Sequence, residues 1–306
     1  MKKIYLDNSA TTPVDKKVVR AMKKYWSKSF ANPSSIHKMG VEAKTVVQNA
    51  KKIIADFLNA HDREIIMTSG GTEANNLAIF GVVNKLAKET KKIHVITSEI
   101  EHSSVLECFK ELEKRGIKVT YLEVDEKGLI NPRDLRKEIR PETALISIGY
   151  VNSEIGIIQP IKEITKEIRH SRKEFGRERT DLPYFHTDAS QASECLNMNV
   201  EELGIDMMTI DAQKIYGPKG IGVLFVKNDV KMEPIIFGVG QEGGRRSGTR
   251  NVPLIVGFAK AIEILEKIKE NECLRAEKLR DEFFNQIKKF VPKAIINGDL
   301  RQRIPN

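Results

Sequence analysis

The stretch IIMTSGGTEANN at residues 65–76 decides the fold class of this chain. A short apolar run at 65–68 leads into a Ser-Gly-Gly turn, and apolar residues then recur with helical spacing over 77–86. A strand, a glycine turn and a helix in this order form one half of a βαβ unit. The stretch therefore predicts an α/β fold with a mostly parallel sheet.

The same alternation continues toward the C-terminus. The runs that we expect to be strands are 94–97, 119–124, 144–151, 184–188, 207–210 and 221–226. Helical patterns begin at Ser103 and cover 135–139, 161–168 and 252–291, the last as one or two long helices. The charged run 169–182 indicates a solvated loop or helix extension, and 294–296 indicates a further strand.

Composition excludes several classes of protein. The chain has 306 residues, 40% hydrophobic and 30% charged, which is typical of a soluble protein with a well-packed core. No apolar run is long enough to span a membrane, and the start shows no secretory signal. The net charge of +9 comes from lysines mixed with glutamates, which favours solvated helix faces over a nucleic-acid surface.

The cysteine pattern points to a reducing compartment. Cys108, Cys195 and Cys273 are widely spaced, odd in number and contain no CxxC motif. This spacing predicts no disulfide framework and favours a cytoplasmic location, where thiols stay unpaired.

Parallel sheets bind ligands at the carboxyl ends of their strands, so the residues that follow each strand are the candidates for binding and catalysis. The Gly70–Gly71–Thr72 turn places free backbone N–H groups at the start of a helix, which suits a phosphate. An ordinary βα turn has the same pattern. The loop GVGQEGGRRSGTRN at 238–251 is similarly either an anion-binding loop or a flexible surface loop.

Three further side chains follow strands and carry reactive groups. Asp188 could pair with a protonated ring nitrogen or cap a helix, and His102 could stack on a planar cofactor or be structural. Lys214 could be a desolvated nucleophile or an exposed turn lysine, and Lys219 is its competitor. A phosphate turn, a stacking histidine, a carboxylate and a lysine are together what pyridoxal 5'-phosphate (PLP) needs.

At these residues the sequence resembles the cysteine desulfurases of the class V aminotransferase superfamily, over essentially the whole chain. The matching motifs are YLDNSATTP, NPSSIHKMG, TSGGTEANNLAI, SEIEHSSV, VNSEIGIIQP, HTDASQ, KIYGPKGIGVLFV and RRSGTRNV. The resemblance implies the type I PLP-dependent transferase fold, in which residues 16–251 form the large domain. Residues 1–15 and 252–306 would form a partial small domain, whose unfinished sheet would leave apolar surface exposed.

The resemblance also implies roles for individual residues. Lys214 would bind the cofactor covalently and act as the base, and His102 would stack on the ring and assist proton transfer. Asp188 would pair with the pyridine nitrogen. The remaining cofactor contacts would come from Gly71, Thr72, Asn152, Gln191, Gln213 and Thr249. Thr249 would reach the phosphate in the partner subunit, which implies a homodimer.

Two departures from the family pattern stand out. The family has Ser-x-His-Lys at the lysine, whereas this chain has Asp211-Ala212-Gln213-Lys214, which places an anion where a phosphate donor is expected. Asp211 would then point away, or weaken phosphate binding, or be offset by Arg245 or Arg246. The family's cysteine loop and substrate-binding arginine would lie beyond residue 306, and each of the three cysteines is expected to be structural.

The resemblance therefore implies a desulfurase that acts on L-cysteine and passes sulfur to an acceptor protein, for iron–sulfur cluster or tRNA thiolation pathways. The 306-residue chain is expected to be truncated or completed by another chain. No membrane or direct nucleic-acid partner and no metal is expected. There are two alternatives: a different PLP-dependent enzyme, such as a lyase or an aminotransferase, and a non-catalytic PLP-binding scaffold.

Overall fold

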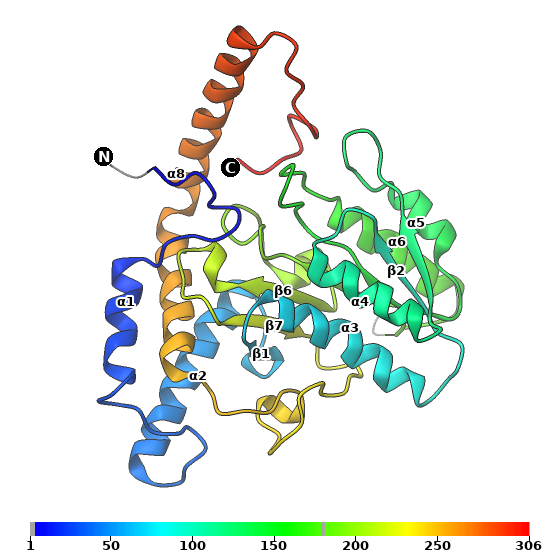
Figure 1. Ribbon diagram of the computed structural model, residues 1–306. Helices are drawn as coiled ribbons and strands as arrows, with labels where there is room; N and C mark the ends of the chain where they lie inside the picture. The colour runs from blue at the N-terminus through cyan, green and yellow to red at the C-terminus, as the bar shows by residue number, and fades with distance from the viewer. Residues whose placement is uncertain (1–3, 179–180, 306) are drawn as a thin grey trace.

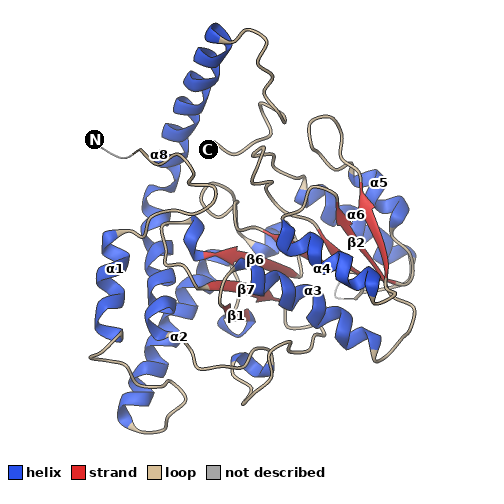
Figure 2. Cartoon of the chain, in the orientation of Figure 1, coloured by secondary structure: helices blue, strands red, loops and turns tan. Residues whose placement is uncertain are grey.

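The computed structural model describes residues 4–178 and 181–305. Within these residues a seven-stranded sheet, in the order β1-β7-β6-β5-β4-β2-β3, carries helices on both faces (Figures 1 and 2). Neighbouring strands are parallel, except that β7 is antiparallel to both β1 and β6. The predicted α/β fold with a mostly parallel sheet is confirmed. The strands are β1 (Ile65–Thr68), β2 (His94–Ser98), β3 (Lys118–Leu122), β4 (Thr143–Ser147), β5 (Tyr184–Asp188), β6 (Met207–Asp211) and β7 (Gly222–Val226).

The helices form two layers because successive strand residues point to opposite faces of the sheet. In β1, Ile65 and Met67 pack into one core and Ile66 packs into the other. The core that contains Ile66 lies under α3 (Gly71–Ala87) and α4 (Ser103–Lys114). The opposite core lies under α1 (Lys16–Met22), α2 (Lys38–Leu58), α5 (Pro132–Glu138), α6 (Ile161–Glu174), α7 (Val200–Leu203) and α8 (Val252–Phe290).

The long helix α8 begins at Val252 and is capped by Asn251, whose side chain accepts a hydrogen bond from the backbone N–H of Leu254. Its first half is buried against α1 and α2, in the same core as the sheet. Its second half projects away from the sheet (Figure 1) and exposes Leu279 and Phe283, among other apolar side chains. The expected exposed apolar surface is therefore present, whereas the domain boundary at residue 252 stays a prediction.

Some expectations about local structure are wrong. Residues 294–296 form no strand; the late pairing is instead a bridge between Arg303 and Ile157. Strand β4 ends at Ser147 and β3 ends at Leu122, both earlier than expected, because the pairing of each strand with its neighbours stops there. For the charged run 169–182, by contrast, one of the two predicted forms holds: α6 extends to Glu174, so the run begins as a helix extension, and residues 179–180 lie outside the described residues.

The cysteine prediction also needs correction. Cys195 and Cys273 form a disulfide across 78 positions of sequence, with 6.0 Å between their Cα atoms. The fold brings the turn after β5 against α8, a proximity that spacing alone does not reveal. Cys108 is free and buried, as expected for a helix-core thiol. No helix in the described part of the chain is both long and apolar enough to cross a membrane.

Candidate functional site

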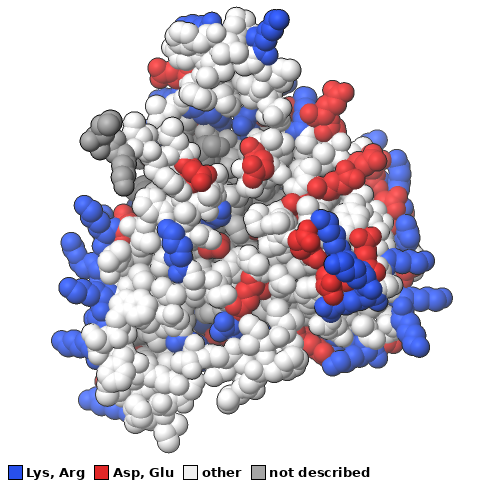
Figure 3. Space-filling view, viewed as in Figure 1, with Lys and Arg blue, Asp and Glu red and all other residues white. Residues whose placement is uncertain are grey.

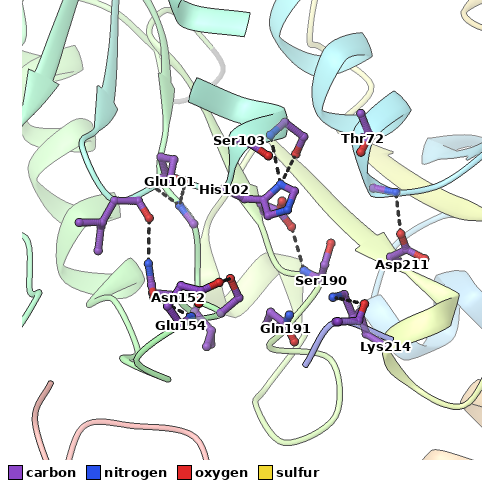
Figure 4. Close-up of a pocket in the computed structure, with 18 of the residues that line it drawn as sticks. Thr72, Glu101, His102, Ser103, Asn152, Glu154, Ser190, Gln191, Asp211 and Lys214 are labelled. Atoms are coloured by element: carbon purple, nitrogen blue, oxygen red, sulfur yellow. Dashed lines mark hydrogen bonds between the residues drawn. The ribbon is translucent and has the colours of Figure 1, made fainter. Parts of the chain in front are cut away.

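A cavity of about 460 Å³ lies where β2, β4, β5 and β6 end, at the carboxyl edge of the parallel strands. Figure 3 shows this face of the molecule hollowed near its centre, with acidic side chains beside the hollow. The structure places most of the predicted site residues together here (Figure 4). Those that line the cavity are Gly71, Thr72, His102, Asn152, Asp188, Gln191, Gln213 and Lys214.

Lys214 lies in the short 3-10 helix Ala212–Lys214 that follows β6. Its ammonium donates hydrogen bonds to the carbonyl oxygens of Ser9 and, at 3.0 Å, Ala10. Burial lowers the pKa of Lys214, against the opposing attraction of Asp211 and Asp188. A lowered pKa increases the fraction of neutral amine, which is the nucleophilic form. Lys219 instead donates to the Thr12 carbonyl at 2.6 Å and does not line the cavity.

Asp188 ends β5 and is fixed by two donors. The amide of Asn75 donates to its Oδ2 at 2.7 Å, and the Ser190 backbone N–H donates to its Oδ1 at 3.0 Å. Asn75 is fully buried one turn after Gly71 on α3. Sequence reasoning missed Asn75, although its spacing of four residues from Gly71 places both on one helix face.

His102 caps α4 rather than projecting freely from it. Its Nδ1 accepts a hydrogen bond from the Ser104 backbone N–H at 3.1 Å and lies 2.8 Å from the Ser104 hydroxyl. Because Nδ1 accepts, the proton of the neutral ring lies on Nε2. The cap is a structural role, one of the two alternatives of the sequence analysis; the ring is also exposed and lines the cavity, so stacking on a cofactor stays a prediction.

The turn at the start of α3 is already bound by a side chain of the protein. Asp211 does not point away from it: its Oδ2 accepts a hydrogen bond from the Gly71 backbone N–H at 2.9 Å (Figure 4). Arg245 and Arg246 are the residues that could offset the negative charge of Asp211, but neither contributes to the cavity. Arg246 forms an ion pair with Glu73, with Nε 2.8 Å from Oε1, and neither Arg245 nor Arg246 lines the cavity.

The remaining predicted residues divide into two groups. Asn152 donates to the Ile100 carbonyl at 2.8 Å, and Gln191 donates to the Ser9 carbonyl at 2.9 Å, so both are held at the cavity wall. Gln213 donates to Asp211 at 3.2 Å. Thr249, by contrast, is exposed and does not line the cavity of its own chain.

Glu101 is a cavity residue that sequence reasoning missed. It accepts hydrogen bonds from the Ser98 hydroxyl at 2.5 Å and from the Gly149 backbone N–H at 2.8 Å. Burial raises the pKa of Glu101 to about 7, partly opposed by these hydrogen bonds. The signal that could have found it is its position directly before His102 at the end of a strand.

None of the three cysteines, all of which lie in the described part of the chain, lines the cavity. The Cys108 thiol donates to the Ser104 carbonyl at 3.1 Å, and burial raises its pKa to about 12. A thiol with so high a pKa is a poor nucleophile at neutral pH. The expectation that Cys108 is structural agrees with this environment.

Comparison with known proteins places these observations in a family. Residues 4–302 match the family described as aminotransferase class-V. The chain is 46% identical to cysteine desulfurase IscS of Dictyoglomus turgidum (strain DSM 6724 / Z-1310), over 100% of this chain and 74% of that protein. It is 42% identical to mitochondrial cysteine desulfurase of Saccharomyces cerevisiae (strain ATCC 204508 / S288c), over 99% of this chain and 59% of that protein.

Two solved structures are also similar. A structure titled "NifS-like protein" superposes with a TM-score of 0.92 and 35% identity, over 100% of this chain and 80% of that chain. A structure titled "SspA in complex with cysteine" superposes with a TM-score of 0.78 and 42% identity, over 85% of this chain and 72% of that chain.

Proposed function

The chain belongs to the aminotransferase class-V family, and we propose that it is a PLP-dependent cysteine desulfurase, which converts L-cysteine to L-alanine and passes the sulfur to a thiol. The observation that supports this most is the meeting of Lys214, Asp188 and His102 in one cavity, each from a different strand end. The named relatives and the similar structure in complex with cysteine support L-cysteine as the substrate.

The residues present fit PLP at three of its four contact regions. Lys214 offers an amine of lowered pKa, Asp188 offers a carboxylate fixed by Asn75 and Ser190, and His102 offers a flat ring at the wall. The start of α3 offers backbone N–H groups for a phosphate. Asp211 is the exception, because it is an anion at that same point.

When bound, PLP supplies an electron sink for the charge that develops at the Cα of an amino acid. Lys214 is the base that removes the Cα proton, since burial favours its neutral form. Asp188 would hold a proton at the ring nitrogen of the cofactor, and its two donors keep its oxygens in place for this. His102, whose Nδ1 accepts from Ser104, would carry its proton on Nε2, stack on the ring and shuttle protons at the leaving sulfur.

Two side chains orient the substrate and cofactor in this proposal. The Asn152 amide donates to the Ile100 carbonyl and its oxygen accepts from the backbone N–H groups of Glu154 and Ile155, so its second amide N–H would be the donor offered to the substrate carboxylate. Gln191 is anchored through the Ser9 carbonyl, which also accepts from Lys214, and would donate to the ring oxygen of the cofactor. The segment around Ser9 therefore links the positions of the base and of the ring.

Sulfur transfer requires a thiolate. The thiol attacks the sulfur of L-cysteine, the carbon–sulfur bond breaks, and L-alanine and a persulfide result. Cys108 is buried outside the cavity, and Cys195 and Cys273 are paired, so the acceptor is a thiol other than these three. An acceptor protein and a homodimer in which the exposed Thr249 serves the neighbouring site complete the proposal. The Cys195–Cys273 disulfide removes the argument from unpaired thiols for a cytoplasmic location.

Product analysis tests this function. The purified chain is incubated with PLP, L-cysteine and dithiothreitol as the thiol, and L-alanine and sulfide are quantified. Equal amounts of both products are expected. Pyruvate with ammonia would indicate a lyase, a keto acid would indicate an aminotransferase, and bound PLP without any product would indicate a binding scaffold; each result would overturn the proposal.

A further inference from the structure

We propose that Asp211 is a built-in competitor for the cofactor phosphate, and that it lowers the affinity of this chain for PLP. The inference rests on the proposed function, because it assumes that a phosphate-bearing cofactor binds at the start of α3. Asp211 stands where the family pattern Ser-x-His-Lys has its serine, and its carboxylate lies at the start of α3.

Asp211 occupies the donor that a phosphate would use. Its side chain is buried, with 5% of the residue exposed, and its Oδ2 accepts from the Gly71 backbone N–H at 2.9 Å. Gly70, at the N-cap position, has no side chain to cap the helix. Asp211 therefore caps α3 from a distant strand, and an anion at a helix N-terminus is stabilised there by the helix dipole.

Gln213, two residues further along the chain, also holds the Asp211 carboxylate in this position. The Gln213 backbone N–H donates to Oδ1 at 3.1 Å, and the Gln213 amide donates to Oδ2 at 3.2 Å. Asp211 is also the last residue of β6, paired with Gly222 of β7. A phosphate that takes the Gly71 N–H must share it with a carboxylate or displace a carboxylate that has two further hydrogen bonds.

The charges around the cavity do not offset this competition. Among the described residues that line the cavity, only Lys214 and His102 can carry positive charge, and none of the lining residues is an arginine. Arg246 is held by Glu73, which lies in the first turn of α3 and brings a second carboxylate to that helix end. The acidic residues that line the cavity are Glu101, Glu154, Asp188 and Asp211.

A direct test compares PLP with pyridoxal, which lacks the phosphate. Dissociation constants of both ligands are measured for the full chain by the absorbance of the lysine-bound cofactor, in wild type, Asp211→Ser and Asp211→Asn. Because repulsion between like charges is removed, we expect PLP to bind about tenfold more tightly to Asp211→Ser. Pyridoxal binding should change less than about twofold, and Asp211→Asn should show an intermediate gain.

Controls separate charge from damage to the fold. Asp134→Ser removes an exposed acidic residue from the first turn of α5 that does not line the cavity, and should change neither constant. Thermal unfolding of each apo variant verifies that it is folded. A merely structural role of Asp211 would weaken both ligands equally.

Two outcomes would overturn the inference in different ways. If the ratio of the PLP and pyridoxal constants is the same in wild type and both variants, or if PLP binds more weakly to both variants, Asp211 does not compete with phosphate and the proposed function still stands. If wild type binds neither ligand, the proposed function fails, and the inference fails with it.

Discussion

Gly222 is the position where a single added methyl group should disturb the site most clearly. It pairs with Thr68 of β1, the strand that leads into α3, and with Asp211 of β6, which accepts from the first residue of α3. A Cβ atom at Gly222 would lie 2.7 Å from the carbonyl carbon and 2.8 Å from the Cα of Gly70. Both are backbone atoms, so no side chain can rotate to relieve the contact.

The size of the effect follows from these distances. Ordinary van der Waals contact begins at 3.4 Å, so Gly222→Ala must move the Gly70 backbone by about 0.7 Å. Overpacking of this kind costs about 1–3 kcal/mol in the free energy of unfolding. The same shift displaces the Gly71 N–H, and we expect PLP to bind about tenfold more weakly.

Urea unfolding and PLP titration measure the two effects separately. Gly116→Ala is the matched control: Gly116 has a φ of +81°, so alanine strains the backbone, but no atom lies within 4 Å of the added Cβ. This control should lose about 1 kcal/mol of stability and bind PLP as wild type does. The reasoning is refuted if Gly222→Ala matches wild type in stability or in PLP affinity.

Three further changes test other parts of the structure. Arg172→Met leaves the Asp206 carboxylate buried without the guanidinium that lies 2.6 Å away, so urea unfolding should show a loss of about 3–5 kcal/mol, and a loss below 1 kcal/mol would contradict this. Cys195→Ser removes a link to Cys273 across 78 positions and should cost about 4 kcal/mol in oxidising buffer; an equal difference from wild type under reductant would argue against the link. The pKa of Glu101 is raised from 4.5 to about 7, so the folded protein binds more protons than the unfolded chain and its stability should fall as pH rises through that window. Glu101→Gln should flatten this slope in thermal unfolding, and an unchanged slope would show that Glu101 is not its source.

The sequence predicts where the strands end better than it predicts which distant residues contact those strand ends. The strand that ends at Asp188 and the strand that precedes Lys214 are predicted by the sequence because apolar runs bounded by polar residues have a strong local signal. Their meeting in one cavity follows from the rule that parallel strands present their carboxyl ends at one edge. Local pattern and sheet topology together therefore account for the gathering of Gly71, His102 and Asn152.

Contacts between distant segments could not be predicted in the same way. The Asp211–Gly71 hydrogen bond spans 140 positions, and the sequence left open whether Asp211 faces the turn or points away from it. Asn75 was missed because its role depends on Asp188, which lies 113 positions away. The cysteine pair was missed for the same reason, since only the fold shows that α8 returns to the turn after β5.

The central claim is that Lys214 moves the Cα proton of an amino acid in this cavity. The most direct test is the loss of the Cα proton signal of L-alanine, the proposed product, in D2O with PLP, followed by proton NMR. This measurement does not depend on any thiol. Lys219→Ala is the matched control, because that lysine lies five residues away and outside the cavity.

We predict rapid exchange with wild type and with Lys219→Ala, and exchange with Lys214→Ala no faster than with free PLP. Exchange by Lys214→Ala at the wild-type rate, or by wild type at the rate of free PLP, would contradict the account.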